Sequence, residues 1–204
     1  LNEKEQHIRR ASLEASLSGE RLDVTIPGRV PVLGRLHPAT QTLRRIYRIF
    51  AEMGFQIYLA PDVETDENNF ELLNIPRHHP ARDMWDTFHT THPGVLLRTH
   101  TSPGQVRVMR ERCPEPIRVI LPGMCYRYEQ TSSRSEIQFN QVEVLAVGEG
   151  ITFGEFKGTM IDFARRMYGE NVRTRLRPSY FPFTEPSAEM DVECFVCGGK
   201  GCTV

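Results

Sequence analysis

The stretch from Cys125 to Glu143, CYRYEQTSSRSEIQFNQVE, limits the fold more than any other segment of the chain. Two runs of strand-forming residues flank a polar loop, which predicts an antiparallel hairpin. Side chains alternate between the two faces of a strand, so Phe139, Gln141 and Glu143 share one face of the second run and two valines share the other. The sequence therefore predicts a sheet with one polar and one apolar face at this point.

The polar face of this hairpin has two interpretations. Arg127 and Glu129 share one face of the first run, as Gln141 and Glu143 do in the second. In most antiparallel hairpins such a face is turned to water. Alternatively, it forms the floor of a binding site, with an arginine, two carboxylates and an amide directed at a charged ligand.

Helical and extended segments alternate along the rest of the chain. Pro38 suits the first turn of a helix and Gly54 its end, and apolar residues between them form one face. By similar criteria we expect helices over residues 2–18, 38–53 and 156–168, and strands over residues 55–61, 94–99, 117–121, 124–130 and 138–147. Strands interrupted by a few long helices predict an α+β fold, with an antiparallel β-sheet flanked by helices.

Composition excludes several classes of protein. The 204 residues are 39% hydrophobic and 25% charged, which suits an ordinary globular protein with one good core. The formal net charge of -1 provides no overall basic field for nucleic acid. No apolar run approaches the roughly 20 residues of a membrane span, and no secretory leader is visible. Because the chain starts at Leu1, we expect it to be a piece of a longer protein.

The cysteines, at positions 113, 125, 194, 197 and 202, argue against a secreted disulfide framework, because their number is odd and three of them cluster. A cytoplasmic location fits this pattern. Cys194 and Cys197 form a CxxC motif that Cys202 follows after four residues, which resembles one side of a zinc knuckle. A structural zinc site generally has four ligands, and only three candidates are visible. The pattern therefore permits a zinc ion without requiring one.

The segment RTHTSPGQ also has two interpretations. Ser102 precedes Pro103 and a short helical pattern, so its hydroxyl would cap the helix by accepting a hydrogen bond from a free backbone N–H group. In the second interpretation, Ser102 and His100 project to the same side, where a helix N-terminus favours an anionic group. A carboxylate or phosphate would then lie nearby.

In the segment SYFPFTEPS, Phe181 and Phe183 alternate around a proline, so in an extended chain both rings and Glu185 share one face. The rings are either core residues or part of a site. Proline restricts such a segment to a sheet edge, or to a place where its missing donor does no harm.

Six segments, in this order, closely resemble the catalytic domain of the bacterial-type phenylalanyl-tRNA synthetase alpha subunit: GRLHPATQTLRRIYRIFAEMGF, ENNFELLNIPRHHPARDMWDTF, LLRTHTSPGQVR, PGMCYRYE, FNQVE and YFPFTEPSAEMDV. The resemblance covers nearly everything from Asp23 to the last residue. It implies the class II aminoacyl-tRNA synthetase fold, with residues 1–20 as the end of an N-terminal helical arm and residues 21–204 as the catalytic core. The third class II signature, a glycine-rich strand and helix with a second ATP arginine, is not in these residues. We therefore expect a C-terminally truncated core that is inactive alone.

The resemblance also implies a role for individual residues. Arg127 would grip the α-phosphate of ATP as the amino-acid carboxylate attacks it, Glu129 would position the adenine or amino-acid end, and Phe139 would stack on adenine. The residues implied to hold the amino acid are His100, Ser102, Gln105, Gln141 and Glu143. Those implied to wall the substrate ring are Phe181 and Phe183. Glu185 is implied to bind magnesium near the beta subunit.

The implied activity is ATP-dependent activation of L-phenylalanine to phenylalanyl-adenylate and its transfer to tRNA(Phe). The implied partner is a beta subunit, in a hetero-tetramer of two alpha and two beta chains. Many members of the family carry DATH in the hairpin loop, whereas this chain has SSRS, with Ser135 in place of the histidine and Arg134 left to make the phosphate contact. The alternative function is a catalytically silent synthetase-like paralogue that binds RNA or zinc.

Overall fold

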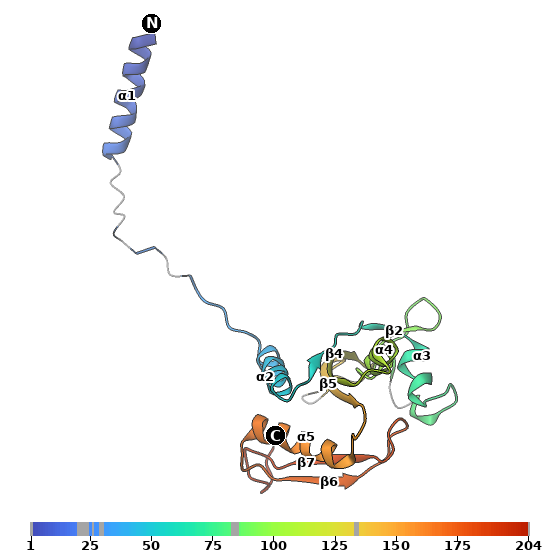
Figure 1. The fold of residues 1–204 in the computed structure, drawn as a ribbon. Helices are drawn as coiled ribbons and strands as arrows, with labels where there is room; N and C mark the ends of the chain where they lie inside the picture. The colour runs from blue at the N-terminus through green and yellow to red at the C-terminus, as the bar shows by residue number, and fades with distance from the viewer. Residues whose placement is uncertain are drawn as a thin grey trace. The chain divides into compact units, whose positions relative to one another are not determined.

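The computed structural model describes residues 2–19, 25, 27–28, 31–82, 86–132 and 135–203 (Figure 1). The chain forms two compact units, residues 1–36 and residues 37–204. Arg134, the expected phosphate contact of the hairpin loop, lies outside the described residues. The second unit holds the sheets and all of the candidate site residues.

The predicted hairpin is present. β4 (Ile117–Tyr126) and β5 (Gln138–Val147) pair in antiparallel register, with Cys125 opposite Phe139 and Leu121 opposite Glu143. This register places the predicted polar residues of β5 on one face, as expected from the alternation.

The prediction of two strands in the place of β4 is wrong, because the strand runs through Pro122 without a break. Tyr58 N–H donates to the carbonyl oxygen of Ile120, so the backbone groups of Ile120 and Pro122 face the side on which β1 (Gln56–Ile57) lies. Within the described chain, β1 pairs with β4 only at Val119 and Ile120. Pro122 lies beyond that pairing, so the backbone N–H group that proline lacks would have had no partner strand among the described residues on this edge.

β4 also ends earlier than predicted. Its last residue is Tyr126, so Arg127 and Glu129 follow the strand instead of lying within it. The N–H group of Arg127 still donates to the carbonyl oxygen of Ile137, but that of Tyr128 donates to the carbonyl oxygen of Asp86. The chain therefore leaves the hairpin ladder directly after Arg127.

The remaining strands are short. β1 pairs parallel with β4, β2 (Val63–Thr65) pairs antiparallel with β3 (Val95–Leu97), and β6 (Thr174–Pro178) pairs antiparallel with β7 (Ala188–Val192). The strand predicted over residues 55–61 is limited to β1. Its later carbonyl groups, at Ala60 and Pro61, accept hydrogen bonds from a buried arginine and take no part in a ladder.

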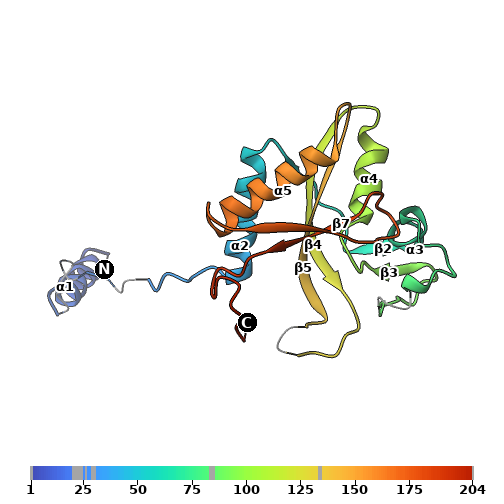
Figure 2. The same ribbon diagram turned by 90° about the horizontal axis from the view of Figure 1, so that it is seen from below.

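Helices cover both faces of the β4–β5 hairpin, as the α+β prediction requires. Figure 2 shows α2 (Pro38–Glu52) and α5 (Phe153–Tyr168) on one side and α4 (Pro103–Arg112) on the other. The helix predicted over residues 156–168 begins three residues earlier, because Thr152 and Glu155 form a capping box at its start.

The two faces of the hairpin have different cores. On the α2 and α5 side, Phe50, Phe55 and Ile120 pack with Val142 and Val144 of β5. On the α4 side, the buried residues are Val108, Ile117, Val119 and Leu121, with Leu145 and Val147 packed against them. The polar residues of β5 continue this second face, so they lie on the same side of the sheet as α4.

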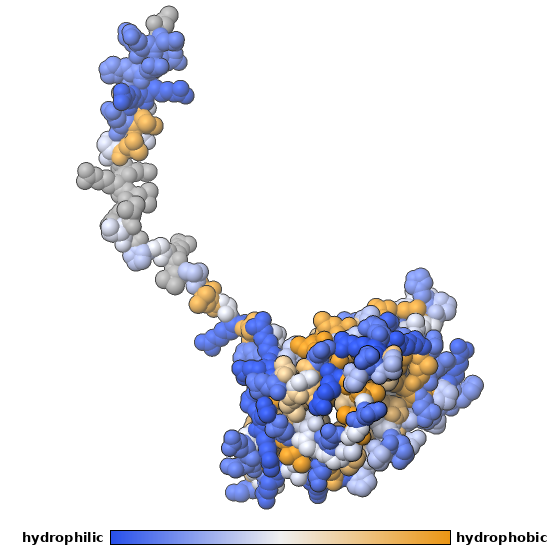
Figure 3. All heavy atoms as spheres, in the orientation of Figure 1, coloured by the Kyte–Doolittle hydropathy of each residue, from blue (hydrophilic) through white to orange (hydrophobic). Residues whose placement is uncertain are grey.

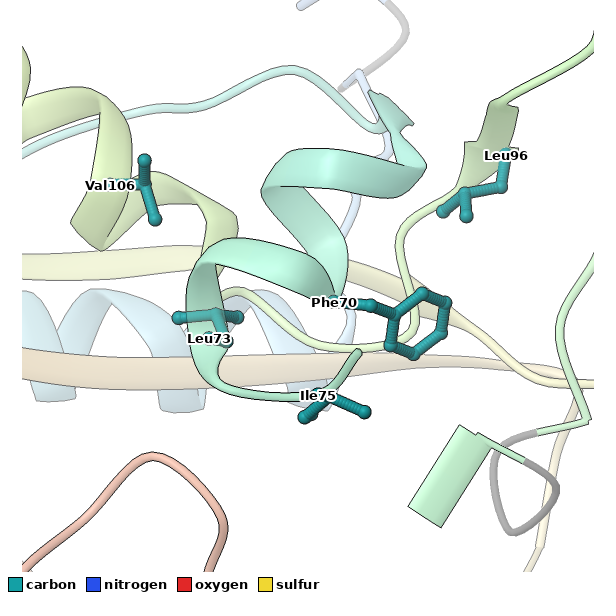
Figure 4. Packing of buried hydrophobic residues seen from close by; sticks show 5 residues of the cluster. All are labelled: Phe70, Leu73, Ile75, Leu96 and Val106. Atoms are coloured by element: carbon teal, nitrogen blue, oxygen red, sulfur yellow. The ribbon is translucent and has the colours of Figure 1, made fainter. Parts of the chain in front are cut away.

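A third hydrophobic cluster lies around α3 (Asp66–Asn69) and the short 3₁₀ helix η1 (Glu71–Leu73). A second 3₁₀ helix, η2, spans Pro80–Arg82. Figure 4 shows the buried side chains of the cluster, which come from the segment after α3, from β3 and from α4: Phe70, Leu73, Ile75, Leu96 and Val106. Phe183 packs against this cluster from the segment between β6 and β7. The cluster therefore fixes one of the predicted substrate-wall residues.

The first unit contains α1 (Asn2–Gly19), the first helix predicted from the sequence. Figure 3 shows hydrophilic side chains over most of it, and its thin apolar stripe includes the exposed residues Ile8 and Leu17. Among the described residues, no helix combines the length and the apolar composition needed to cross a membrane.

Candidate functional site

A carboxylate on β5 is held by two side chains from the start of α4. Ser102 Oγ donates a hydrogen bond to Glu143 Oε1, and Gln105 Nε2 donates to Glu143 Oε2 at 3.0 Å. Burial raises the pKa of Glu143, while these two hydrogen bonds act in the opposite direction. The residues of this polar face are half-buried, and the Glu143 carboxylate is engaged by the protein, so the face is not simply turned to water.

The helix-cap interpretation of Ser102 is wrong. Ser102 is the residue before α4, but its backbone is already helical (φ -59°, ψ -26°) and its side chain makes no capping hydrogen bond. Its hydroxyl bonds to Glu143 instead, and a hydrogen bond to an ionised group is stronger than one to a neutral backbone amide.

Arg127 lies over the ring of Phe139 on the same side of the sheet. Its Cζ atom is 5.0 Å from the ring centroid, and its Nε donates to the carbonyl oxygen of Thr99 at 3.1 Å. The Nη1 atom is 3.8 Å from Glu129 Oε1. The structure thus brings together the three residues expected to contact ATP, with a partly buried guanidinium among them.

His100 is buried between two aromatic rings. It is 4% exposed, its ring lies edge-on to Phe70 with centroids 6.4 Å apart, and it stacks on Phe183 at 6.3 Å. Burial, followed by the positive charge of Arg127, lowers the pKa of His100 to about 3. A neutral imidazole therefore joins Phe183 in an uncharged wall.

The segment that carries Phe181 and Phe183 is not extended as predicted. Phe181 forms an isolated bridge with Thr184, and the chain turns between them. Both rings nevertheless line one cleft of about 380 Å³, together with Phe153 and Phe156 from the start of α5. Phe183 is thus a core contact and a cleft wall at once.

Gln141 lies between Glu143 and Phe139 on the same face of β5. Cys125, on the neighbouring strand, donates a hydrogen bond from Sγ to Gln141 Oε1 at 3.6 Å. Burial raises the pKa of Cys125 to about 12, so this thiol stays protonated and can act only as a weak donor. It fixes the orientation of the Gln141 amide.

Sequence reasoning missed Arg98. The side chain of this arginine is 2% exposed, and it donates to the carbonyl oxygens of Met124 at 2.7 Å and Ala60 at 2.9 Å. Its Nη2 also contacts Asp62 Oδ1 at 2.8 Å. Arg98 thereby joins the segment after β1 to the strand that leads to Arg127. The signal in the sequence was an arginine directly after the apolar residues of LLRTH, because an arginine that is buried in such a segment needs paired acceptors.

Glu185 is an exposed carboxylate in the turn between β6 and β7, and among the described residues it belongs to no cluster of three or more potential metal ligands. Magnesium usually keeps several waters and binds to one or two carboxylates together with substrate phosphates. The accessible carboxylate of Glu185 therefore fits a magnesium ion that is shared with ATP. Separately, the structure brings Cys194, Cys197 and Cys202 together, with their sulfur atoms all within 4.8 Å of one another.

Comparison with known proteins identifies relatives of the whole chain. It is 58% identical over 208 residues to the phenylalanine–tRNA ligase alpha subunit of Roseiflexus castenholzii, covering 100% of this chain and 60% of the relative. It is 59% identical to the protein of the same name from Herpetosiphon aurantiacus, covering 98% of this chain and 59% of that relative. The chain thus spans about 60% of the length of these relatives.

The fold has a counterpart among solved structures. A pyrrolysyl tRNA synthetase from Desulfitobacterium hafniense superimposes with a TM-score of 0.56 at 14% identity, covering 76% of this chain and 54% of the other. This likeness confirms the predicted fold class. The family model described as "tRNA synthetases class II core domain (F)" matches residues 21–203. Since that match covers most of the chain, the chain belongs to the family of class II tRNA synthetase core domains.

Proposed function

We propose that this chain is the catalytic core of a phenylalanine–tRNA ligase alpha subunit, which activates L-phenylalanine with ATP and transfers it to tRNA(Phe). The enzyme would act in the cytoplasm with a beta subunit, in an assembly of two alpha and two beta chains. The names of the relatives support the assignment. The observation that carries it is the carboxylate of Glu143, held by Gln105 and by Ser102, two residues along the chain from His100, whose ring stacks on Phe183.

This arrangement suits an amino acid with an apolar ring. The ammonium group would pair with Glu143, because a buried carboxylate is a strong partner for a cation. Gln141, on the same face, offers an amide to the polar end of the substrate. The ring would lie against Phe183 and Phe181, where aromatic pairs favour stacked or edge-to-face contact.

Arg127, Glu129 and Phe139 would serve ATP. An oxygen of the amino-acid carboxylate attacks the α-phosphorus and pyrophosphate leaves, so the developing negative charge lies where a guanidinium can stabilise it. Arg127 is the cation that this site supplies, and Phe139 and Glu129 would position the adenosine. Glu185 would hold magnesium, which supplies charge neutralisation to the phosphates when bound. The proposed reaction uses no residue of the cysteine cluster.

The test is amino-acid-dependent exchange of pyrophosphate into ATP by the complete enzyme, with alpha and beta subunits expressed together. Phenylalanine should support exchange and tRNA(Phe) should be charged. Glu143→Gln should raise the KM for phenylalanine by roughly 10-fold to 100-fold, since a hydrogen bond to a charged group contributes about 1.5–3 kcal/mol, and should leave the KM for ATP nearly unchanged.

Glu149→Gln is the matched control, because Glu149 is an exposed glutamate just beyond β5. Exchange driven by a different amino acid would contradict the assignment. A complete enzyme that binds RNA but supports no exchange would instead identify the silent paralogue.

A further inference from the structure

Three cysteine sulfurs near the end of the described chain have the spacing of metal ligands. The Sγ atoms of Cys194 and Cys202 are 3.8 Å apart, and all three, with Cys197, lie within 4.8 Å of one another. Zinc–sulfur bonds of about 2.3 Å in tetrahedral geometry put two sulfurs about 3.8 Å apart. A disulfide would require about 2.05 Å between two sulfurs, much less than the 3.8 Å between Cys194 and Cys202.

The backbone after Cys194 forms a tight turn within the cluster. The N–H of Gly198 donates a hydrogen bond to the Cys194 carbonyl oxygen at 2.8 Å. This turn has positive φ angles of 57° at Gly198 and 76° at Gly199, which glycine adopts at little cost. The turn thus holds the two cysteines of the CxxC motif near each other and leads the chain back to Cys202.

We propose that Cys194, Cys197 and Cys202 bind one zinc ion as thiolates. Each thiol gives up its proton to solvent as the metal binds, and no electron transfer is involved. Three thiolates on a soft, tetrahedral site suit zinc. Among the described residues no further imidazole, thiol or carboxylate joins the three sulfurs, so the fourth ligand that a structural zinc site needs would come from outside the described residues.

The site would fasten the end of β7 to two neighbouring elements. Glu193, just before the first cysteine, donates its N–H to the carbonyl oxygen of Arg173 at 2.9 Å, next to β6. Phe195, inside the CxxC motif, stacks on Tyr168 at the end of α5, with centroids 5.7 Å apart and planes 15° apart. A zinc ion would therefore stabilise the junction of α5 with the β6–β7 hairpin, and its role would be structural.

The first measurement is metal content by elemental analysis of the complete alpha–beta enzyme. Cys194→Ser, Cys197→Ser and Cys202→Ser should each lower zinc by close to one atom per alpha chain. Cys113→Ser is the matched control, because Cys113 is an exposed thiol outside the cluster, and its zinc content should equal that of the parent. Equal zinc in the parent and the three cluster variants would overturn the proposal.

A second measurement tests the proposal even if the cysteine variants fail to fold. X-ray absorption of the parent should show at least three sulfur ligands at about 2.3 Å. Cys202→His, which keeps a ligand atom, should retain zinc with one sulfur replaced by nitrogen. Iron in place of zinc, fewer than three sulfurs, or a Cys194–Cys202 disulfide in the purified enzyme would each overturn the proposal.

Discussion

Arg98 fills the space that a side chain at Gly123 would need. A Cβ atom at position 123 would lie 1.8 Å from Nη2 of Arg98. Arg98 cannot move aside easily, because its hydrogen bonds to Met124 and Ala60 hold it in place. Gly123→Ala should therefore lower the free energy of unfolding by about 1–3 kcal/mol, as overpacking does in other cores, and urea unfolding would measure it.

Gly158→Ala is the matched control. Gly158 lies inside α5, and a Cβ atom there would meet nothing within 4 Å. Alanine forms helices better than glycine, so this change should raise the free energy of unfolding by roughly 0.5–1 kcal/mol. Two changes of the same sign and size would contradict the steric account of Gly123.

Arg127→Ala in the complete enzyme should slow adenylate formation by at least ~100-fold, equivalent to about 2.7 kcal/mol, because charge develops on the α-phosphate in the transition state. Rapid-quench measurement of adenylate formation would test this. Arg118→Ala is the control, since Arg118 also lies over a ring, that of Phe55 at 4.8 Å, but on the opposite face of the hairpin. A rate within a few-fold of the parent would mean that Arg127 has another role.

Phe183→Ala should enlarge the pocket for the substrate ring. Phenylalanine should bind more weakly by roughly 0.5–1.5 kcal/mol from lost ring contact, plus lost burial, while ATP binding stays nearly intact. Para-chlorophenylalanine should become a better substrate relative to phenylalanine. The measurement is exchange with phenylalanine, tyrosine and para-chlorophenylalanine, and Tyr180→Ala, an exposed ring that does not line the cleft, is the control. Unchanged selectivity would leave Phe183 as a core residue only.

His100 should make stability depend on pH. Because its pKa in the folded protein is about 3, the unfolded chain takes up a proton below about pH 6.5 that the folded chain does not. The free energy of unfolding should therefore be highest above that pH and fall below it, by at most about 1.4 kcal/mol per pH unit. His100→Gln should remove this contribution between pH 7 and 5, whereas the exposed His92→Gln should not. Parallel pH profiles for the parent and His100→Gln would contradict the burial of a neutral imidazole.

Local patterns in the sequence were sufficient for the main elements. Alternation placed Glu143 and Gln141 on the face opposite Val142, and the structure confirms this. The prediction holds because successive side chains of a strand must point to one face of the sheet or to the other. The prediction failed at Pro122 because a strand accepts proline where the missing N–H group faces an unpaired edge. Which edge of the strand is paired depends on segments that are distant in the sequence.

Contacts between distant segments were not predictable in the same way. Nothing in the sequence around Ser102 shows that its hydroxyl will donate a hydrogen bond to a carboxylate 41 residues later. Arg98 likewise finds its acceptors in the segment after β1 and in β4, so its burial follows from the tertiary fold. The roles of Arg127, Phe139 and Glu185 rest on the family resemblance and remain predictions.

The clamp on Glu143 has a consequence for how this site can change by mutation. Its two oxygen atoms are held by different residues of one helix, Ser102 and Gln105, so the effects of substituting these positions cannot be additive. Losing one donor leaves a half-satisfied buried carboxylate, and losing the carboxylate as well removes that penalty. The loss of stability caused by a substitution at Ser102 or Gln105 therefore depends on whether Glu143 is still present. Replacing these residues one at a time should destabilise the protein more at each intermediate than replacing them together.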